Sequence, residues 1–205
     1  MSEEKKIGIN DVTLYYDDLF QHDDDLARHV YVNCIVDADI IDTAVYKILR
    51  YNTLDREIPV AERKPIIVYI NSPGGSVVDG FALVDAIECS ETPVYTVNLG
   101  ACMSMGLFIY MAGHKRYAMP RSQFLLHEGF ISDGDSVSKV KDYIDFKTSQ
   151  FESVVRDFVL KHSKITDKKY KANARKEWYF LPDEGKELGI VDYVIGVDVG
   201  INEII

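Results

Sequence analysis

Gly100-Ala-Cys-Met-Ser-Met-Gly106 is the stretch of sequence that decides the fold, because it joins two apolar segments of different character. The segment at 94–98, which reads VYTVN, is typical of a strand, and the segment at 107–112, which reads LFIYMA, is predicted to be helical. Ser104 is therefore expected at a turn from a strand into a helix. The first N–H groups of a helix lack intrahelical partners and stabilise negative charge, so this serine is either a candidate nucleophile or an ordinary helix N-cap.

A glycine-rich turn lies one strand–helix–strand step upstream of Ser104. It reads Asn71-Ser-Pro-Gly-Gly-Ser76 and follows a continuous apolar run at 65–70, which is predicted to be a strand buried on both faces. Glycines let the backbone turn sharply and approach a substrate carbonyl closely, although a tight turn alone would also explain them. Because the carboxyl ends of parallel strands gather at one edge of a sheet, this turn and Ser104 are expected to converge on one site.

His127 is the candidate general base, because a serine nucleophile needs a group that takes its proton. It ends the short apolar run Phe124-Leu-Leu-His127, which is predicted to be a strand. A lone histidine is more often structural than catalytic, so this assignment depends on the other motifs. The remaining histidines lie in polar surroundings and are expected to be structural or on the surface: His22, His29, His114 and His162.

From residue 29 onward, strand and helix patterns alternate, which predicts an α/β fold with a parallel sheet and right-handed crossovers. Residues 1–28 are acidic and are expected to form an N-terminal arm, and residues 29–205 are expected to form one domain. The predicted strands cover 30–34, 65–70, 94–98, 116–118, 123–126 and 190–195, and the predicted helices cover 37–51, 77–89, 104–112, 135–162, 166–176 and 181–189.

The composition argues against several classes of protein. The 205 residues carry a formal net charge of −10 and no dense basic patch, so a nucleic-acid partner is not expected. The longest apolar run is too short to span a bilayer and no signal peptide is recognised, so no membrane partner is expected and a cytoplasmic location is predicted. The odd number of cysteines has no metal-ligand spacing, which favours thiols in a reducing compartment: Cys34, Cys89 and Cys102.

Taken together and in their order, the motifs resemble the proteolytic subunit of the Clp protease, a self-compartmentalised serine peptidase. The resemblance implies a spiral of repeated β-β-α units, a fold shared with crotonases, from which a long handle helix at about 135–162 protrudes. It covers roughly residues 28–196 and rests on Ile70-Asn-Ser-Pro-Gly-Gly-Ser-Val77, Ser104-Met-Gly106, Lys115-Arg-Tyr-Ala-Met-Pro120, Leu126-His127 and Glu184-Gly-Lys-Glu-Leu-Gly-Ile-Val-Asp192.

The resemblance also implies a role for each motif. Ser104 corresponds to the nucleophile and His127 to the general base. The backbone N–H groups of Gly75 and Met105 correspond to the oxyanion hole, which stabilises the negative charge of the reaction intermediate. Substrate contacts are implied at Gly74, Ser76 and Val77.

The third member of the family's triad is an aspartate, and this sequence departs from the pattern there. A gap-free count back from Ile190-Val-Asp192 places Glu177 at that position. A glutamate can also orient a histidine, whereas the plain alternative is a surface carboxylate paired with Arg175 or Lys176. Two other carboxylates are rivals that do not match the motif: Asp167 and Asp183.

The predicted helix at 135–162 carries an apolar stripe, which needs a partner surface. In the family, this handle packs two seven-membered rings face to face. The resemblance therefore implies stacked heptameric rings of this chain, an AAA+ unfoldase that supplies unfolded polypeptides at the expense of ATP, and no metal or organic cofactor in the subunit. The stripe consists of Val137, Val140, Ile144, Phe151, Val155 and Phe158.

Two alternatives stay open. One is a catalytically weak or silent scaffold subunit of a mixed ring. It is suggested by the glutamate at position 177 and by Glu128-Gly129 after His127, where the family usually has Gln-Pro. The other is a crotonase-like acyl-CoA enzyme, because that fold shares the oxyanion architecture. Such an enzyme would need a basic cluster for the adenine phosphate, and no such cluster is found in the sequence.

Overall fold

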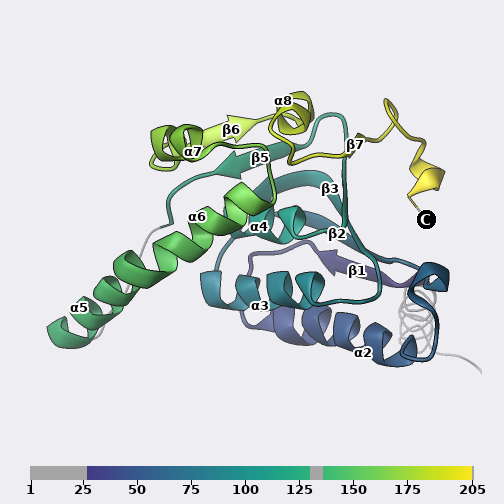
Figure 1. Cartoon of the computed structure of the whole chain (residues 1–205), viewed down its shortest axis with the longest axis horizontal. Helices are drawn as coiled ribbons and strands as arrows, with labels where there is room; N and C mark the ends of the chain where they lie inside the picture. Colours follow the sequence, from purple (N-terminus) through teal and green to yellow (C-terminus); the bar gives the residue numbers. More distant parts are fainter. Residues whose placement is uncertain (1–26, 130–135, 205) are drawn as a thin grey trace, which may run out of the picture.

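Parallel strands with helices between them make up residues 27–129 and 136–204, which this computed structural model describes (Figure 1). Of the predicted N-terminal arm, only the last two residues fall within these ranges. The strands are β1 (His29–Val32), β2 (Ile66–Ser72), β3 (Val94–Met103), β4 (Lys115–Ala118), β5 (Gln123–Leu126), β6 (Trp178–Phe180) and β7 (Tyr193–Val194). The α-helices are α2 (Tyr46–Leu54), α3 (Val77–Glu88), α4 (Met105–Met111), α5 (Val137–Phe146), α6 (Glu152–Lys161), α7 (Asp167–Asn173) and α8 (Pro182–Glu187). Short π- and 3-10-helical turns are η1 (Ile41–Val45), η2 (Val60–Glu62), η3 (Lys147–Phe151) and η4 (Ile201–Glu203).

The strands form one sheet in the order β1-β2-β3-β4-β7, with β5 beside β3 and β6 beside β5. Every pair is parallel except β5 with β6. The predicted α/β fold with a parallel sheet is therefore confirmed. The antiparallel strand β6 is absent from the sequence prediction, because its three residues are too few to display an alternating pattern.

β3 changes its partner halfway along its length. Tyr95–Asn98 pair with β4, and Ala101–Met103 pair with β5. The buried side chain of Asn98 stabilises the point where β3 changes from β4 to β5. Its Nδ2 donates to the Gln123 carbonyl at 3.0 Å, and its Oδ1 accepts from the Gly100 N–H at 3.0 Å. The strand is therefore longer than predicted, because β5 supplies a second set of ladder partners beyond residue 98.

Two other predicted elements have different bounds. The strand predicted at 190–195 is confined to β7, because the N–H groups of Ile190 and Val191 bond to the Gly185 carbonyl at 2.8 and 3.1 Å and so complete the end of α8. The helix predicted at 37–51 contains the π-helical turn η1 and continues as α2 to Leu54.

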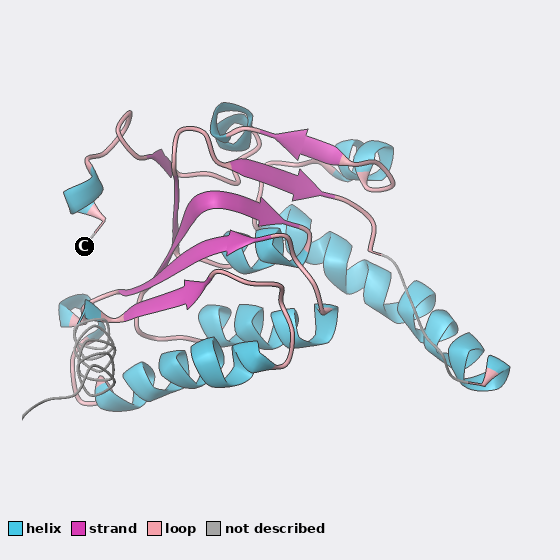
Figure 2. Ribbon diagram, turned by 180° about the vertical axis from the view of Figure 1, so that it is seen from behind, coloured by secondary structure: helices cyan, strands magenta, loops and turns pink. Residues whose placement is uncertain are grey.

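Helices cover one face of the central strands. Side chains on that face form the main core with α2, α3, α4 and α6, whereas the opposite face packs against the C-terminal segment after β7. On β2, for example, Val68 lies in the main core, while Ile67 packs near Ile204 on the other face. Figures 1 and 2 show α2 and α3 side by side beneath the strands, with the C-terminal segment apart from them.

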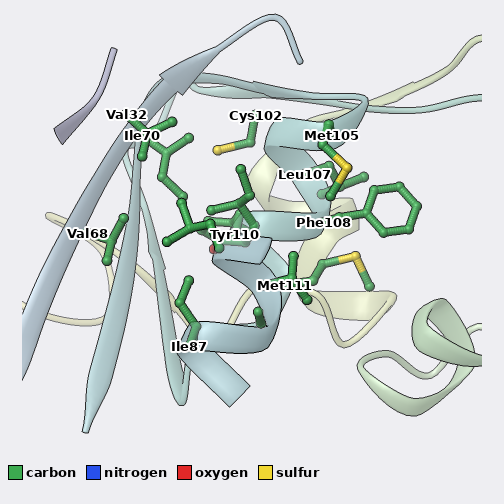
Figure 3. Close-up of a cluster of buried hydrophobic side chains, with 14 of the residues drawn as sticks. Val32, Val68, Ile70, Ile87, Cys102, Met105, Leu107, Phe108, Tyr110 and Met111 are labelled. Carbon is green, nitrogen blue, oxygen red and sulfur yellow. The ribbon is translucent and has the colours of Figure 1, made fainter. Parts of the chain in front are cut away.

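Helix α4 is buried over its whole length, from Met105 to Met111. A helix that is apolar on all sides is stable only inside a core. Figure 3 shows side chains of this helix, among them Leu107 and Tyr110, packed near Ile70 of β2 and Ile87 of α3. This packing fixes the N-terminus of α4 against the sheet, which is where the candidate nucleophile lies.

α5, the π-helical turn η3 and α6 follow one another as a long helix that projects from the body of the domain (Figure 1). It corresponds to the handle predicted at about 135–162. Its apolar stripe divides into two parts: Phe158 is buried and Phe151 and Val155 pack against the domain, whereas Ile144 is exposed. The chain's own core is therefore the partner surface for the C-terminal part of the stripe.

Replacing Asn98 by alanine is expected to lower the free energy of unfolding by about 1–3 kcal/mol, because the Gly100 N–H and the Gln123 carbonyl lose their partner. The same change should loosen β5 and raise amide hydrogen exchange at Gln123–Leu126. Denaturant unfolding and hydrogen-exchange mass spectrometry measure the two effects.

Asn52→Ala is the matched control for this substitution. The Asn52 carboxamide also bonds to backbone groups, donating to the Ile48 carbonyl at 2.9 Å and accepting from the Glu91 N–H at 2.9 Å, but none of its partners lies on β3 or β5. It should cost stability without a selective effect on β5. Equal exchange at β5 in the two variants would contradict the role of Asn98.

Candidate active site

Ser104 lies at the turn between β3 and α4, with φ 52° and ψ −123°. Among the described residues other than glycine, only Arg28 also has a positive φ. Such a conformation costs about 1–3 kcal/mol and persists only where surrounding contacts fix it. Here the Ser104 N–H donates to the Leu125 carbonyl at 2.9 Å. The Ser104 side chain makes no capping hydrogen bond, so an ordinary N-cap does not explain this strained serine.

The glycine-rich turn after β2 packs directly on Ser104. A Cβ at Gly74 would lie 2.6 Å from the Ser104 Cβ and 2.8 Å from the Met103 carbonyl oxygen, so no larger residue fits. Gly74 also has a φ of 95°, which side chains disfavour. The structure thus brings together the two turns that the sequence analysis expected to converge.

The two N–H groups expected to bind the oxyanion flank this contact. Met105 is the first residue of α4, so its N–H has no intrahelical partner, and its nitrogen lies 3.0 Å from the place a Cβ on Gly74 would take. In the bridge between Gly75 and Val36, the bonds run from the Val36 N–H to the Gly74 carbonyl and from the Ser76 N–H to the Val36 carbonyl, at 2.9 and 2.7 Å. These bonds leave the Gly75 N–H without a partner among the described residues.

His127 follows the end of β5, and Glu177 precedes the start of β6. The antiparallel register pairs Leu126 with Trp178, which places the next residues, His127 and Glu177, opposite each other. The His127 Nδ1 lies 2.9 Å from the Glu177 Oε1, and the two side chains are 20% and 60% exposed. With Nδ1–H donating to the carboxylate, Nε2 keeps the lone pair that a general base needs.

Within the described ranges, no hydrogen bond or ion pair links Glu177 to the cations, or His127 to the other carboxylates, that the sequence offered as alternatives. Glu177 forms no ion pair with Arg175 or Lys176 among the described residues, and Arg175 instead lies 3.9 Å from Glu128. The rival carboxylate Asp167 accepts from Arg156 at 2.6 Å and pairs with Lys171 at 2.7 Å, and the exposed Asp183 lies in the first turn of α8. Of the carboxylates weighed from the sequence, only Glu177 hydrogen-bonds to the His127 ring.

The nucleophile and base candidates lie at the ends of adjacent strands, but they are not hydrogen-bonded to each other. Within the described part of the chain, the Ser104 hydroxyl has no hydrogen-bond partner, and the His127 ring bonds only to Glu177. Catalytic hydrogen bonds are often long or misaligned without substrate and tighten in the complex. If these residues are a nucleophile and its base, proton transfer would require the Ser104 hydroxyl and the His127 Nε2 to approach each other when substrate binds.

The residues expected to contact substrate already have structural partners. Gly74 donates its N–H to the Ser72 Oγ at 3.2 Å, Ser76 caps α3 by accepting from the Asp79 N–H at 3.4 Å, and Val77 packs against the core. Substrate binding at these residues stays a prediction. Ser72 lies within the quoted glycine-rich motif, but no role was predicted for it.

Three other histidines have structural partners. His114 accepts the Val94 N–H on Nδ1 at 2.9 Å, and burial lowers its pKa, which keeps the ring neutral. His162 lies 2.8 Å from Glu88, and burial, as the largest cause, lowers its pKa as well. His29 packs edge-on against Tyr69. The structural role expected for these three residues is thus visible in their contacts, while His22 lies outside the described residues.

The thiol nearest to Ser104 in sequence is a poor nucleophile. Cys102 is fully buried, and burial raises the pKa of its thiol well above the usual value. Across the described ranges, no group of three or more His, Cys, Asp or Glu side chains could hold a metal ion. No helix within these ranges is long and apolar enough to cross a membrane.

A family model described as Clp protease matches residues 23–198. The chain belongs to the Clp protease family. The ATP-dependent Clp protease proteolytic subunit 2 of Nocardia farcinica is 32% identical over 173 residues, which cover 82% of this chain and 80% of the relative. The subunit of the same name from Rhodococcus jostii is 30% identical over 173 residues, which cover 82% of this chain and 84% of the relative.

A solved structure shares this fold. It is a single-substitution mutant of ClpP1 from Listeria monocytogenes, which matches with a TM-score of 0.71 over 89% of this chain and 98% of that one, at 19% identity. The resemblance and the Clp-type α/β fold inferred from the sequence motifs are therefore confirmed. At this identity the structural match carries the fold alone.

Replacing Glu177 by glutamine keeps the shape of the side chain and removes the charge that would stabilise a protonated His127 if this pair belongs to a triad. A buried triad carboxylate is worth about 10⁴-fold in turnover. Because the Glu177 side chain is 60% exposed and water screens its charge, we expect peptide hydrolysis to fall by about 10- to 100-fold. Steady-state hydrolysis of a fluorogenic peptide measures the change.

Glu128→Gln is the control, since Glu128 is next to His127, is 55% exposed and, among the described residues, forms only a 3.9 Å ion pair with Arg175. It should leave turnover close to wild type. If Glu177→Gln also hydrolysed peptide at the wild-type rate, a different group would have to orient His127.

Proposed function

We propose that this member of the Clp protease family is a serine endopeptidase subunit that hydrolyses unfolded polypeptides. The observation that carries the proposal is the strained Ser104 turn, held against a glycine turn and beside a histidine–glutamate pair. Family membership supports the reaction class, and the relatives reported above are named as proteolytic subunits.

In the proposed reaction, the Ser104 hydroxyl oxygen attacks the carbonyl carbon of the scissile peptide bond. The hydroxyl proton moves to Nε2 of His127, and the N–H groups of Gly75 and Met105 donate to the resulting oxyanion. His127 then gives its proton to the leaving amine as the C–N bond breaks. A water molecule cleaves the acyl-enzyme by the same route and regenerates Ser104, so no metal or organic cofactor is required of the subunit.

Glu177 acts in this scheme by orienting His127 and stabilising its positive charge. Because Glu177 is largely exposed just before β6, water screens its charge, and we expect its contribution to be weaker than that of a buried carboxylate. A catalytically weak or silent scaffold subunit is the second candidate function, and two observations favour it. Glu177 is largely exposed, and the Ser104 hydroxyl is not bonded to His127.

We further propose that the projecting helix mediates assembly into stacked rings. It exposes large apolar side chains, each at least 38% accessible. Three of them lie on α5, the outer part, and one on α6: Tyr143, Ile144 and Phe146, and Val154. Exposed apolar surface of this kind is typical of interaction sites. A barrel built in this way would enclose the active sites, and an AAA+ unfoldase would supply the unfolded chains. The free cysteines fit a reducing compartment such as the cytoplasm.

Ser104→Ala tests the chemistry. The substitution should reduce peptide hydrolysis by at least about 10³-fold, because removing the nucleophile of a triad abolishes covalent catalysis. A fluorophosphonate probe should phosphonylate the wild-type protein at Ser104, as located by mass spectrometry, and should not label the variant. Size-exclusion chromatography with light scattering should give the same particle size for both proteins.

Two outcomes of this experiment would reject the proposal in different ways. Wild-type turnover in Ser104→Ala would mean that another residue is the nucleophile. A wild-type protein that assembles but neither hydrolyses peptide nor reacts with the probe would establish the scaffold role instead.

Ile144→Asp tests assembly, because it places a charge on the exposed part of the helix. We expect particles smaller than those of the wild type, since burying an unpaired carboxylate in an interface costs several kcal/mol. Light scattering measures the particle mass. Phe151→Asp is less suitable, because Phe151 packs edge-on against Phe81 at 5.5 Å and the variant would also disturb the domain.

Val197→Asp is the control for Ile144→Asp. Val197 is 73% exposed, compared with 40% for Ile144, and lies after β7 rather than on the projecting helix. It should assemble like the wild type. An Ile144→Asp particle of wild-type mass would rule out this part of the helix as an assembly surface.

A further inference from the structure

Ser72 is a fully buried serine at the end of β2 whose hydroxyl joins two segments of the chain. Its Oγ donates to the Cys34 carbonyl at 2.6 Å and accepts from the Gly74 N–H at 3.2 Å. Buried hydroxyls without such partners are costly, so this pair of bonds is a fixed feature of the site. Ser72 thereby links the segment after β1 to the glycine turn.

Ser72 also lies against the first turn of α4. A Cβ at Gly106 would lie 3.1 Å from the Ser72 Cβ and 3.1 Å from its carbonyl oxygen, so the helix backbone approaches this residue closely. Gly106 directly follows Met105, whose N–H is one of the proposed oxyanion donors. Ser72 therefore touches the backbone next to both donors, Met105 on one side and the Gly74–Gly75 peptide on the other.

The orientation of the Gly75 N–H depends on that peptide. In a trans peptide the C=O and N–H groups point in opposite directions, and no described peptide bond is cis. Since the Gly74 carbonyl accepts from the Val36 N–H at 2.9 Å, the Gly75 N–H points away from Val36. Rotation of this peptide by half a turn would remove one of the two oxyanion donors.

Glycine cannot fix this orientation by itself. Gly74 and Gly75 have φ values of 95° and 149°, and glycine moves between such conformations with little steric resistance. The Val36 N–H holds the peptide at the Gly74 carbonyl, and the Ser72 hydroxyl holds the preceding N–H of Gly74. The two bonds together restrain the turn on both sides of the Gly74 Cα.

We propose that Ser72 is a positioning residue for the oxyanion hole, and this inference rests on the proposed peptidase function. Its hydroxyl sets the Gly74–Gly75 peptide relative to the N-terminus of α4, so that the N–H groups of Gly75 and Met105 point to one oxygen. Removing the hydroxyl leaves the glycine turn with one restraint fewer. The loss falls on the transition state and the tetrahedral intermediate rather than on substrate binding, because the bound substrate carries no oxyanion.

Ser72→Ala is the test, and Ser122→Ala is its matched control. Ser122 is 1% exposed and donates its hydroxyl to the Met119 carbonyl at 2.8 Å, so it resembles Ser72 in burial and bonding but does not touch the glycine turn. We expect kcat of Ser72→Ala for a fluorogenic peptide to fall about 10- to 100-fold with KM nearly unchanged, as for a misplaced catalytic group. Ser122→Ala should keep wild-type kcat even if its thermal midpoint falls.

Two further measurements separate positioning from a general loss of structure. Inhibition by a peptide boronic acid, which mimics the tetrahedral intermediate, should weaken in Ser72→Ala by a factor similar to the fall in kcat/KM. Hydrogen exchange of the peptide that contains Gly74 should rise in Ser72→Ala and stay at the wild-type level in Ser122→Ala.

The outcomes distinguish this inference from the proposed function. If the wild-type protein is inactive toward peptide and probe, the proposed function fails, and the exchange at Gly74 alone decides the role of Ser72. Unchanged exchange, an unchanged kcat, or equal losses of kcat in both variants would each overturn the inference. If Ser72→Ala does not assemble, Ser72→Cys replaces it, because the thiol keeps a weak donor and a weak acceptor at this position.

Discussion

The hydrogen bond from the Ser104 N–H to the Leu125 carbonyl is the interaction on which the candidate site depends. It extends the pairing of β3 with β5 one step beyond the end of β3 and ties the strained turn to the strand that leads into His127. The antiparallel pairing of β5 with β6 then sets Glu177 opposite His127. A slip of β5 by one residue would turn its side chains to the other face of the sheet and separate all three groups.

The glycine turn must lie close to Ser104, but its glycines cannot fix their own orientation. It must approach Ser104 so closely that a Cβ at Gly74 would lie 2.6 Å from the Ser104 Cβ, which rules out any residue except glycine. A glycine backbone has no side chain that could hold its orientation. The restraint therefore comes from neighbouring groups, the Val36 backbone on one side and the buried Ser72 hydroxyl on the other. Close approach and fixed orientation are thus supplied by different residues.

Features encoded in local patterns could be predicted from the sequence. The Ser104 turn, the helix after Ser76 and the parallel strands follow from apolar runs and glycine positions within a few residues of each other. The antiparallel strand β6 could not be predicted, because its pairing with β5 is a contact over fifty residues and only Phe180 of its three side chains is buried. Glu177 was found by counting along a family motif rather than from chemistry. The position of the Ser104 hydroxyl relative to His127 depends on side-chain rotamers, which a sequence pattern does not specify.

The projecting helix joins the proposed assembly surface to the core that carries the nucleophile. Phe158 of α6 stacks on Phe108 of α4 with ring centroids 5.6 Å apart, and Phe81 of α3 contacts both rings at 6.1 and 5.8 Å. Phe151 extends the same aromatic cluster outward along the helix. Because packed aromatic rings resist independent movement, the inner part of the helix and the helix that begins after Ser104 behave as one packed unit. We therefore expect substitutions within this cluster to alter folding together with the proposed assembly and chemistry, whereas a substitution at an exposed position such as Ile144 should affect the proposed assembly alone.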